Sequence, residues 1–217
     1  MRIDIWLDYV CPFCYLGTKR LDQALAELGM KDAELVYHSF ELDPQAKRHT
    51  GMSVPQQIAD KYDMPLEEAE AMHEGLAEQG RELGLAFAMD QAVPTNTHAA
   101  HRVAQRMQQQ SGAQVFRWVD AMFEGHFAQG LDIGDEDVLA ELSQKAGFDA
   151  GLVQDALSDA VTEAAVEADI QQARSIGVQG VPFFVFNRTH AVSGAQPTEL
   201  FVQALEQLRD GADSEAN

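Results

Sequence analysis

Apolar and polar positions over the first 40 residues change period twice. Apolar residues alternate with polar ones over residues 3–7, which predicts a strand. A helical apolar face follows over residues 21–28 and ends at Gly29, a residue suited to closing a helix. Residues 35–38 return to strand character. The opening of the chain is therefore predicted to be β-α-β.

The middle of the chain has a different character. From about residue 54 to residue 176 it is rich in Ala, Glu, Gln and Met at helical spacing, with little β-branched alternation. Pro55 and Pro65 suit the first turns of two helices, whereas residues 84–94 have no clear period. Four further helices are predicted, at residues 97–111, 113–127, 135–146 and 162–175.

Strand character returns near the C-terminal end. Residues 183–186 form an apolar run suited to a strand buried on both faces, and Asn187-Arg188 fits the turn of a hairpin whose second strand holds residues 191–192. Pro197 opens a last amphipathic helix, and residues 211–217 are expected to fray. The order β-α-β, helical insertion, β-β-α predicts an α/β sheet interrupted by an all-helical cap.

Charge narrows the possible partners. The chain has 35 acidic and 15 basic residues, a formal net charge of −20, so long-range repulsion argues against nucleic acid and anionic membranes. No apolar run approaches the roughly 20 residues of a membrane span, and the first six residues carry charges where a signal peptide needs an apolar core. We expect a cytoplasmic protein, whose thiols are mostly reduced.

The only two cysteines lie in Cys11-Pro12-Phe13-Cys14, between the first strand and the first helix. A thiol at the first turn of a helix faces unpaired backbone N–H groups and the positive end of the helix dipole. Both favour the thiolate, so Cys11 is predicted to be a nucleophile, with Cys14 close enough to form a disulfide with it. Pro12 and Phe13 would then lie beside the substrate.

Metal binding and a purely structural role of the thiols fit the sequence less well than a reactive dithiol. Zinc normally takes four ligands, and the chain has no second cysteine pair to complete a site with Cys11 and Cys14. His98 and His101 share a predicted helix but lack an accompanying carboxylate signature, so no metal site is predicted. Two buried structural thiols are the remaining alternative, which the helix-start position disfavours.

Two acids, Asp4 and Asp8, precede the cysteines. A buried acid beneath the dithiol could transfer a proton to or from Cys14. Asp8 is instead expected to face solvent or to cap the loop.

Four segments of the chain carry a resemblance to known proteins. The segments are Asp8-Tyr9-Val10-Cys11-Pro12-Phe13-Cys14, Asn96-Thr97 with Ala100-His101-Arg102, Gly177-Val178-Gln179-Gly180-Val181-Pro182-Phe183, and Val192-Ser193-Gly194-Ala195-Gln196. In this order along the chain, they resemble the DsbA-like branch of the thioredoxin fold. They further resemble the FrnE-type oxidoreductases, the hydroxychromene-carboxylate isomerases and the kappa-class glutathione transferases.

The resemblance implies how the chain is divided and where substrate binds. It implies a thioredoxin-like domain of residues 1–43 and 177–217, with a helical cap of residues 44–176. It also implies a cis peptide bond at Val181-Pro182 that faces the dithiol, so that the backbone of Val181 can pair with an extended substrate.

The resemblance further implies a cleft between cap and core, lined by Asn96, Thr97 and His101. In the isomerases and transferases a serine usually holds the nucleophile position. Here Cys11 holds it and Cys14 follows, which favours thiol–disulfide exchange with protein substrates: Cys11 attacks and Cys14 resolves the mixed disulfide.

The function is accordingly expected to be that of a thiol–disulfide oxidoreductase or isomerase. In a reducing compartment we expect reduction or isomerisation of substrate disulfides, with no bound cofactor and with glutathione or another dithiol protein as external reductant. Glutathione-dependent isomerisation or transfer on a small molecule stays open, as does a non-catalytic, chaperone-like peptide-binding module. The sequence does not indicate an oligomeric state.

Overall fold

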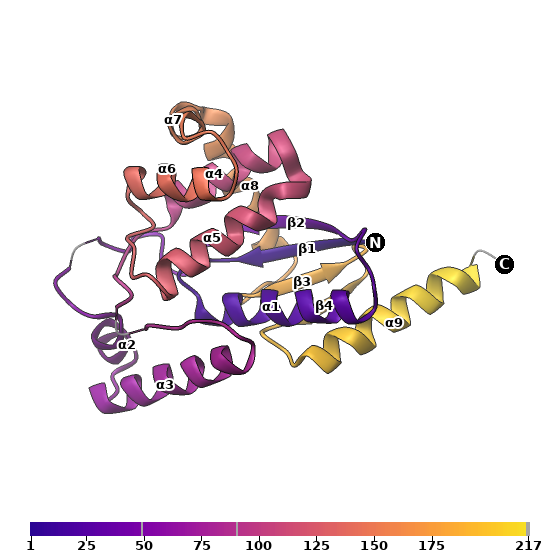
Figure 1. Cartoon of the computed structure of the whole chain (residues 1–217), viewed down its shortest axis with the longest axis horizontal. Helices are drawn as coiled ribbons and strands as arrows, with labels where there is room; N and C mark the ends of the chain where they lie inside the picture. The colour runs from indigo at the N-terminus through magenta and orange to yellow at the C-terminus, as the bar shows by residue number, and fades with distance from the viewer. Residues whose placement is uncertain (49, 90, 216–217) are drawn as a thin grey trace.

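The computed structural model of the chain describes residues 1–48, 50–89 and 91–215. Within them, helices surround a four-stranded sheet (Figure 1). The elements are β1 (Arg2–Leu7), α1 (Pro12–Glu27), β2 (Glu34–Ser39), α2 (Val54–Tyr62), α3 (Leu66–Glu82), α4 (His98–Ser111), a 3-10 turn (Gly112–Gln114), α5 (Val115–Phe127), α6 (Glu136–Lys145), α7 (Gly151–Ser158), α8 (Ala160–Ser175), β3 (Phe183–Phe186), β4 (His190–Ser193) and α9 (Thr198–Glu215).

The strand order is β2-β1-β3-β4. β1 runs parallel to β2 and antiparallel to β3, so segments from both ends of the chain meet at the centre of the sheet. β3 and β4 form the predicted hairpin, and Asn187 and Arg188 have φ values of 47° and 61° at its turn. Two consecutive positive φ values are typical of a hairpin turn whose twist matches that of the strands.

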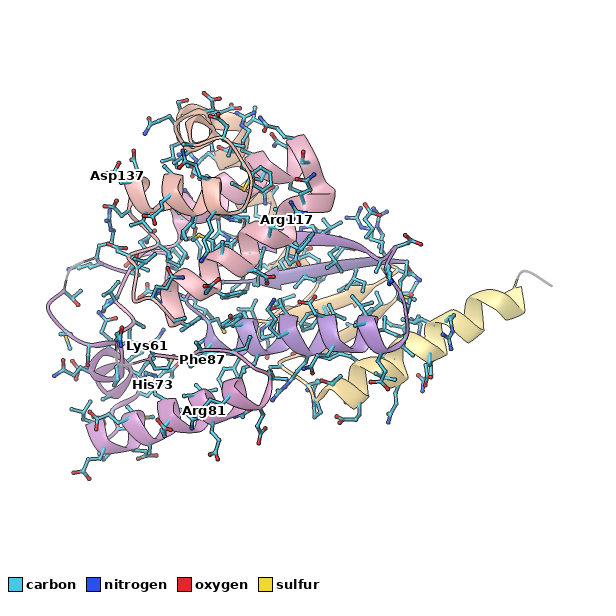
Figure 2. All side chains as sticks on the ribbon, in the orientation of Figure 1. Lys61, His73, Arg81, Phe87, Arg117 and Asp137 are labelled. Carbon is cyan, nitrogen blue, oxygen red and sulfur yellow. The ribbon has the colours of Figure 1, made fainter. Side chains whose placement is uncertain are left out.

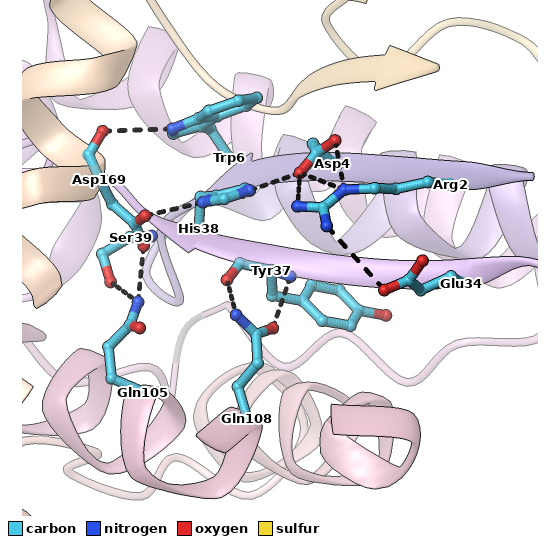
Figure 3. Close-up of polar contacts among 10 residues, drawn as sticks. All are labelled: Arg2, Asp4, Trp6, Glu34, Tyr37, His38, Ser39, Gln105, Gln108 and Asp169. Carbon is cyan, nitrogen blue, oxygen red and sulfur yellow. Dashed lines mark hydrogen bonds and ion pairs between the residues drawn. The ribbon is translucent and has the colours of Figure 1, made fainter. Parts of the chain in front are cut away.

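The sheet is covered on both faces. On one face α1 and α9 pack over Ile3, Ile5 and Phe184, each 0% exposed. On the other face α8 packs over Trp6, which is 2% exposed. Asp4 on that face is only 5% exposed, so this polar position of β1 does not face solvent. It lies instead in a polar network beneath α8 (Figure 3).

The inserted helices form two groups in Figure 1. Helices α4 to α8 gather on the β2 side of the sheet, whereas α2 and α3 lie near the start of α1. Local capping explains where several of them begin. Ser53 and Gln56 make a reciprocal capping box at α2, and the side chains of Asp135 and Asp159 accept hydrogen bonds from the first turns of α6 and α8.

Most predicted elements are confirmed, with four corrections. Helix α7 is not in the prediction because it is only eight residues long and gives a weak periodic signal. Pro65 is the N-cap of α3 and not part of its first turn. Asp8 is buried, as described below. Helix α9 continues to Glu215 where fraying from residue 211 is expected, and residues 216–217 lie outside the described part.

The division into residues 1–43 with 177–217, and 44–176, stays a prediction. The four strands fall in the first two of these ranges, and α2 to α8 fall in the third. Among the described residues, no helix combines the length and the apolar character needed to cross a membrane.

Candidate active site

Cys11 is the N-cap residue of α1. Its backbone is extended, with φ −90° and ψ 110°, and its N–H donates to the carbonyl of Asp8 at 3.0 Å. Its own carbonyl accepts from Cys14 N at 3.0 Å and so begins the helix. Pro12 follows at the first position, where a missing N–H costs no helical bond. The sulfur of Cys11 therefore lies at the positive end of α1, as the sequence predicts.

The two thiols differ in environment. Both are unbridged, Cys11 is 4% exposed and Cys14 is 0% exposed. Burial raises the pKa of Cys14 well above its usual value, and a hydrogen bond and charge shared with Cys11 raise it further. Cys11 is thus the thiol nearer the surface, and Cys14 is the thiol enclosed behind it.

The loop after α8 packs directly on the dithiol. The Val181–Pro182 peptide bond is cis, and the Cys11 thiol donates to the Val181 carbonyl across 3.6 Å. Gly17 on α1 makes this approach possible, because a Cβ there would lie 2.8 Å from Cγ of Pro182. A side chain at position 17 would push the loop away from the thiols. Docking of an extended substrate on Val181 and Pro182 stays a prediction.

Exposed apolar side chains flank the thiols. Phe13, between the two cysteines, is 46% exposed, and Leu42, in the loop after β2, is 43% exposed. The N–H of Leu42 donates to Asp8 Oδ2 at 2.8 Å, which holds that loop close to the start of α1. Pro12 is half-buried. Contact of Pro12 and Phe13 with substrate stays a prediction. The sequence does not single out Leu42 as a site residue, because Leu42 belongs to no periodic element.

Asp8 is not exposed, contrary to expectation: it is 1% exposed and lies behind the dithiol. His101 on α4 is also 1% exposed, and its Nε2 lies 3.5 Å from Asp8 Oδ1. The ring of His101 packs on Tyr9, with 4.8 Å between ring centroids. His101 therefore lies on α4 against the residues that follow β1, and it is enclosed. The cleft between cap and core that it is expected to line stays a prediction. A direct contact of His101 with substrate stays a prediction, and this burial argues against it.

Neighbours of His101 in the motif have structural contacts. Nδ2 of Asn96 donates to the carbonyls of Pro44 and Ala46, which ties the loop after β2 to the start of α4. Arg102 donates to the carbonyl of Asp159, which ties α4 to the start of α8. These side chains fix the position of α4 and hence that of His101.

His98 belongs to a separate contact. Its Nδ1 lies 2.6 Å from Glu41 and its Nε2 lies 3.0 Å from Glu163. The hydrogen bond with Glu41, joined by the one with Glu163, raises the pKa of His98 to about 9. The two histidines therefore do not form one site. Among the described residues, no group of three or more His, Cys, Asp or Glu side chains is placed to hold a metal ion.

A groove of ≈ 870 Å³ lies at the far end of α1. It is lined by the C-terminal half of α1, including Leu25, and by the first residues of β2, including Leu35. Because Cys11 lies at the opposite end of the same helix, this groove is not part of the dithiol site.

The sheet order, the helical insertion and a dithiol at the start of α1 define a DsbA-like thioredoxin fold. The model of the DSBA-like thioredoxin domain family matches residues 2–206, and the chain belongs to this family. The resemblance found in the sequence is thereby confirmed.

Solved structures agree with this assignment. A probable DsbA oxidoreductase, SCO1869 from Streptomyces coelicolor, is 38% identical, with a TM-score of 0.86 over 95% of this chain and 89% of that one. A 2-hydroxychromene-2-carboxylate isomerase is 19% identical, with a TM-score of 0.70 over 98% of both chains. The cytosolic disulfide reductase DsbM from Pseudomonas aeruginosa is 17% identical, with a TM-score of 0.68 over 96% and 99% of the two chains. The latter two show a shared fold alone.

Proposed function

We propose that this protein is a thiol–disulfide oxidoreductase that reduces or isomerises disulfides in protein substrates. The observation that carries the proposal is the pair of unlike thiols: Cys11 at the uncapped start of α1 against the Val181 carbonyl, and Cys14 enclosed behind it. A helix start favours a thiolate, and a thiolate is the attacking species in disulfide exchange.

The reaction takes two exchanges. The Cys11 thiolate attacks one sulfur of a substrate disulfide, so a Cys11–substrate disulfide forms and the other substrate sulfur leaves as thiolate. Cys14 then loses its proton and attacks the Cys11 sulfur, which releases the second substrate thiolate and leaves a Cys11–Cys14 disulfide. The exposed side chains of Phe13 and Leu42 offer apolar contact to a polypeptide around the reacting sulfur.

The oxidised protein then needs two electrons from outside, because the chain has only these two cysteines. We propose glutathione as the reductant: two glutathione thiols reduce Cys11–Cys14 and leave as glutathione disulfide. The fold shared with DsbM, which has been solved with glutathione, supports this choice. Reduction by glutathione fits the cytoplasmic location that we propose.

Reduction of insulin disulfides tests the proposal. With dithiothreitol or glutathione as reductant, the wild type is expected to turn over, and Cys11→Ser is expected to fall to the uncatalysed rate because the nucleophile is gone. Cys14→Ser is the matched control, since it removes an equivalent sulfur but keeps the attacking one. It should accumulate a mixed disulfide visible by intact-protein mass spectrometry.

Other outcomes favour other functions. Saturable glutathione binding with full activity on a small molecule in Cys14→Ser would favour glutathione-dependent isomerisation or transfer. Suppression of protein aggregation that is unchanged in Cys11→Ser, without insulin reduction, would favour a non-catalytic binding module.

A further inference from the structure

The outer edge of β2 is partly covered by side chains from the inserted helices. The N–H of Glu34 donates to the residue before β1, so alternate residues of β2 pair with β1 and those between them turn their backbone groups outward. The outward backbone of Tyr37 makes two hydrogen bonds with the side-chain amide of Gln108 on α4 (Figure 3). The outward N–H of Ser39 donates to a carboxylate of α8. Side chains thus occupy the edge at these two positions.

Leu35 is the outward-facing residue of β2 that lacks such a cover. Among the described residues, neither its N–H nor its C=O has a hydrogen-bond partner. Unpaired backbone groups at the edge of a sheet form a template for another extended chain. Because the edge is covered again at Tyr37, the free stretch offers pairing to one residue of a partner.

A groove lies beside this free stretch. It is the groove of ≈ 870 Å³ at the far end of α1, and Leu35 and Gln108 both line it, so it follows the outer edge of β2. Its volume is within the range of about 300–1,000 Å³ that is usual for ligand sites. The apolar side chains that line the rest of it are Leu25, Ala26, Met30, Ala33, Val36 and Phe116. A ligand in the groove therefore meets a free backbone edge beside an apolar wall.

Charge distinguishes between the possible occupants. Among the described residues that line the groove, the acidic ones are Asp22, Asp32 and Glu34 and the basic ones are Arg2 and Lys31. Arg2 already pairs with Asp4 at 2.6 Å and with Glu34 at 3.9 Å. The whole chain carries a formal net charge of −20, so it repels a second copy and attracts a basic polypeptide.

We propose that this groove binds an extended stretch of a partner polypeptide whose apolar side chains are flanked by Lys or Arg. One residue of the partner pairs with the N–H and C=O of Leu35, as the amide of Gln108 pairs with Tyr37. The apolar side chains of the partner pack in the groove, and its basic residues lie near Asp22 and Asp32.

The groove and the dithiol are at opposite ends of α1. The part of this helix between Cys11 and Leu25 is about 20 Å long, at about 1.5 Å per residue. One stretch of a polypeptide can therefore occupy the groove while another reaches the thiols. Binding in the groove needs neither cysteine, so this inference goes beyond the proposed function and does not depend on it.

Fluorescence anisotropy of a labelled peptide tests the inference. The probe is Lys-Thr-Val-Leu-Val-Thr-Lys with both ends blocked, which has no cysteine and cannot react with the thiols. We expect saturable binding to the wild type and equal binding to Cys11→Ser. A matched probe carries N-methyl groups on its Val-Leu-Val residues and lacks the N–H groups that pair with a strand. It should bind about tenfold more weakly. A probe with Glu in place of both Lys should also bind more weakly, because the protein repels it.

Three variants change the groove itself. Ala26→Trp fills it from an exposed position of α1 and should weaken binding of the Lys probe at least about tenfold. Leu35→Pro removes the outward N–H, at an edge position where proline costs no bond to β1, and should have a similar effect. Asp32→Lys reverses an exposed charge and should weaken binding by about 2- to 5-fold.

Two control variants make the same kinds of change elsewhere. Ala71→Trp is at an exposed position of α3, and Asp137→Lys is at an exposed position of α6 (Figure 2). Neither residue lines the groove, so both variants should keep the affinity of the wild type.

The outcomes separate the occupants. A wild type without saturable binding, or with equal affinity for the methylated probe, would overturn the inference. Unchanged affinity in Ala26→Trp would do the same, since the peptide would then bind elsewhere. If circular dichroism shows that Leu35→Pro is unfolded, Ala26→Trp and the methylated probe decide in its place.

Sedimentation velocity tests the second copy as occupant. A wild-type dimer that Ala26→Trp converts to a monomer would assign the groove to a second copy and overturn the inference. A monomeric wild type that binds the Lys probe supports it. A wild type that binds this probe but does not reduce insulin would overturn the proposed function alone.

Discussion

Asp4 and Asp8 are four residues apart and both are buried, yet their surroundings are opposite. Asp4 accepts hydrogen bonds from Arg2 and lies 2.8 Å from Nε2 of His38. Nδ1 of His38 lies 2.7 Å from Asp169 on α8, so the ring bridges two carboxylates (Figure 3). Every charge in this set has an opposite charge in contact.

The carboxylate of Asp8 has fewer contacts among the described residues. One oxygen accepts from the backbone N–H of Leu42, and in that part of the chain the other faces His101 without a hydrogen bond. Burial of a carboxylate therefore does not by itself indicate a function. Asp4 is held by charged partners that also contribute to the packing of α8, whereas one oxygen of Asp8 has no hydrogen-bond partner among the described residues.

The largest expected effect is on the Asp4 side. Asp169→Ala removes the acceptor for His38, for the N–H of Ser39 and for Gln105. Removing one partner of a buried charged network typically costs about 3–5 kcal/mol, so we expect a loss of that size in urea denaturation. Glu141→Ala, at an exposed position of α6, is the control and should stay within about 0.5 kcal/mol. A loss below about 1 kcal/mol for Asp169→Ala would contradict the structural role of the network.

The pH dependence of stability is the next effect. Burial opposes the charge of His38, but hydrogen bonds to Asp169 and Asp4 raise its pKa above 6.5, so its contribution is complete below pH 6.5 and is lost as pH rises through the folded-state pKa. Burial likewise opposes the charge of Asp4, but hydrogen bonds from His38 and Arg2 hold its pKa below 3.8. The contribution of Asp4 is present above pH 3.8 and is lost in more acidic solution.

The network should therefore stabilise the fold most between pH 3.8 and pH 6.5. Above that window the slope is at most about 1.4 kcal/mol per pH unit for one proton. Urea denaturation of the wild type and His38→Gln at a series of pH values measures this slope. The free energy of unfolding of the variant should not decline on the alkaline side as that of the wild type does. Parallel plots of stability against pH for the two proteins would contradict the assignment to His38.

A smaller effect is expected at the exposed end of the network. Arg2→Ala removes a partner of Asp4. Because the Arg2 side chain is 31% exposed, we expect a loss of about 0.2–1 kcal/mol in the free energy of unfolding. Urea denaturation with and without added salt checks this loss. Salt screens the ion pair, so it should reduce the difference in stability between the wild type and Arg2→Ala. A loss as large as that of Asp169→Ala would mean that Asp4 depends on Arg2 more than on His38.

The smallest stability effect is expected for Asp8→Asn, at most about 0.5 kcal/mol. The amide oxygen can still accept from Leu42 N, and the other carboxylate oxygen has no hydrogen bond to lose within the part of the chain that the structure describes. Urea denaturation beside Asp169→Ala measures the contrast. A loss of several kcal/mol would show that Asp8 is structural like Asp4, whatever its effect on exchange.

Local patterns determine much of this fold. The period over residues 3–7, the long helices of the insertion, the hairpin turn at Asn187-Arg188 and the helix-start position of Cys11 are all visible in the sequence. Each depends on neighbours within a few residues, through side-chain period, turn geometry or the unpaired N–H groups of a helix start. The proposal that Cys11 and Cys14 form the reactive centre depends on the same short stretch.

Only the tertiary structure decides which polar side chains are enclosed, and with what. His101 reaches Asp8 because α4, about 90 residues further along the chain, packs against the end of β1. His38 is enclosed because α8 covers it with Asp169. Burial and pairing of charge depend on elements distant in sequence. A local period therefore cannot tell Asp4, which lies against His38, from Asp8, which accepts a hydrogen bond from the backbone of Leu42.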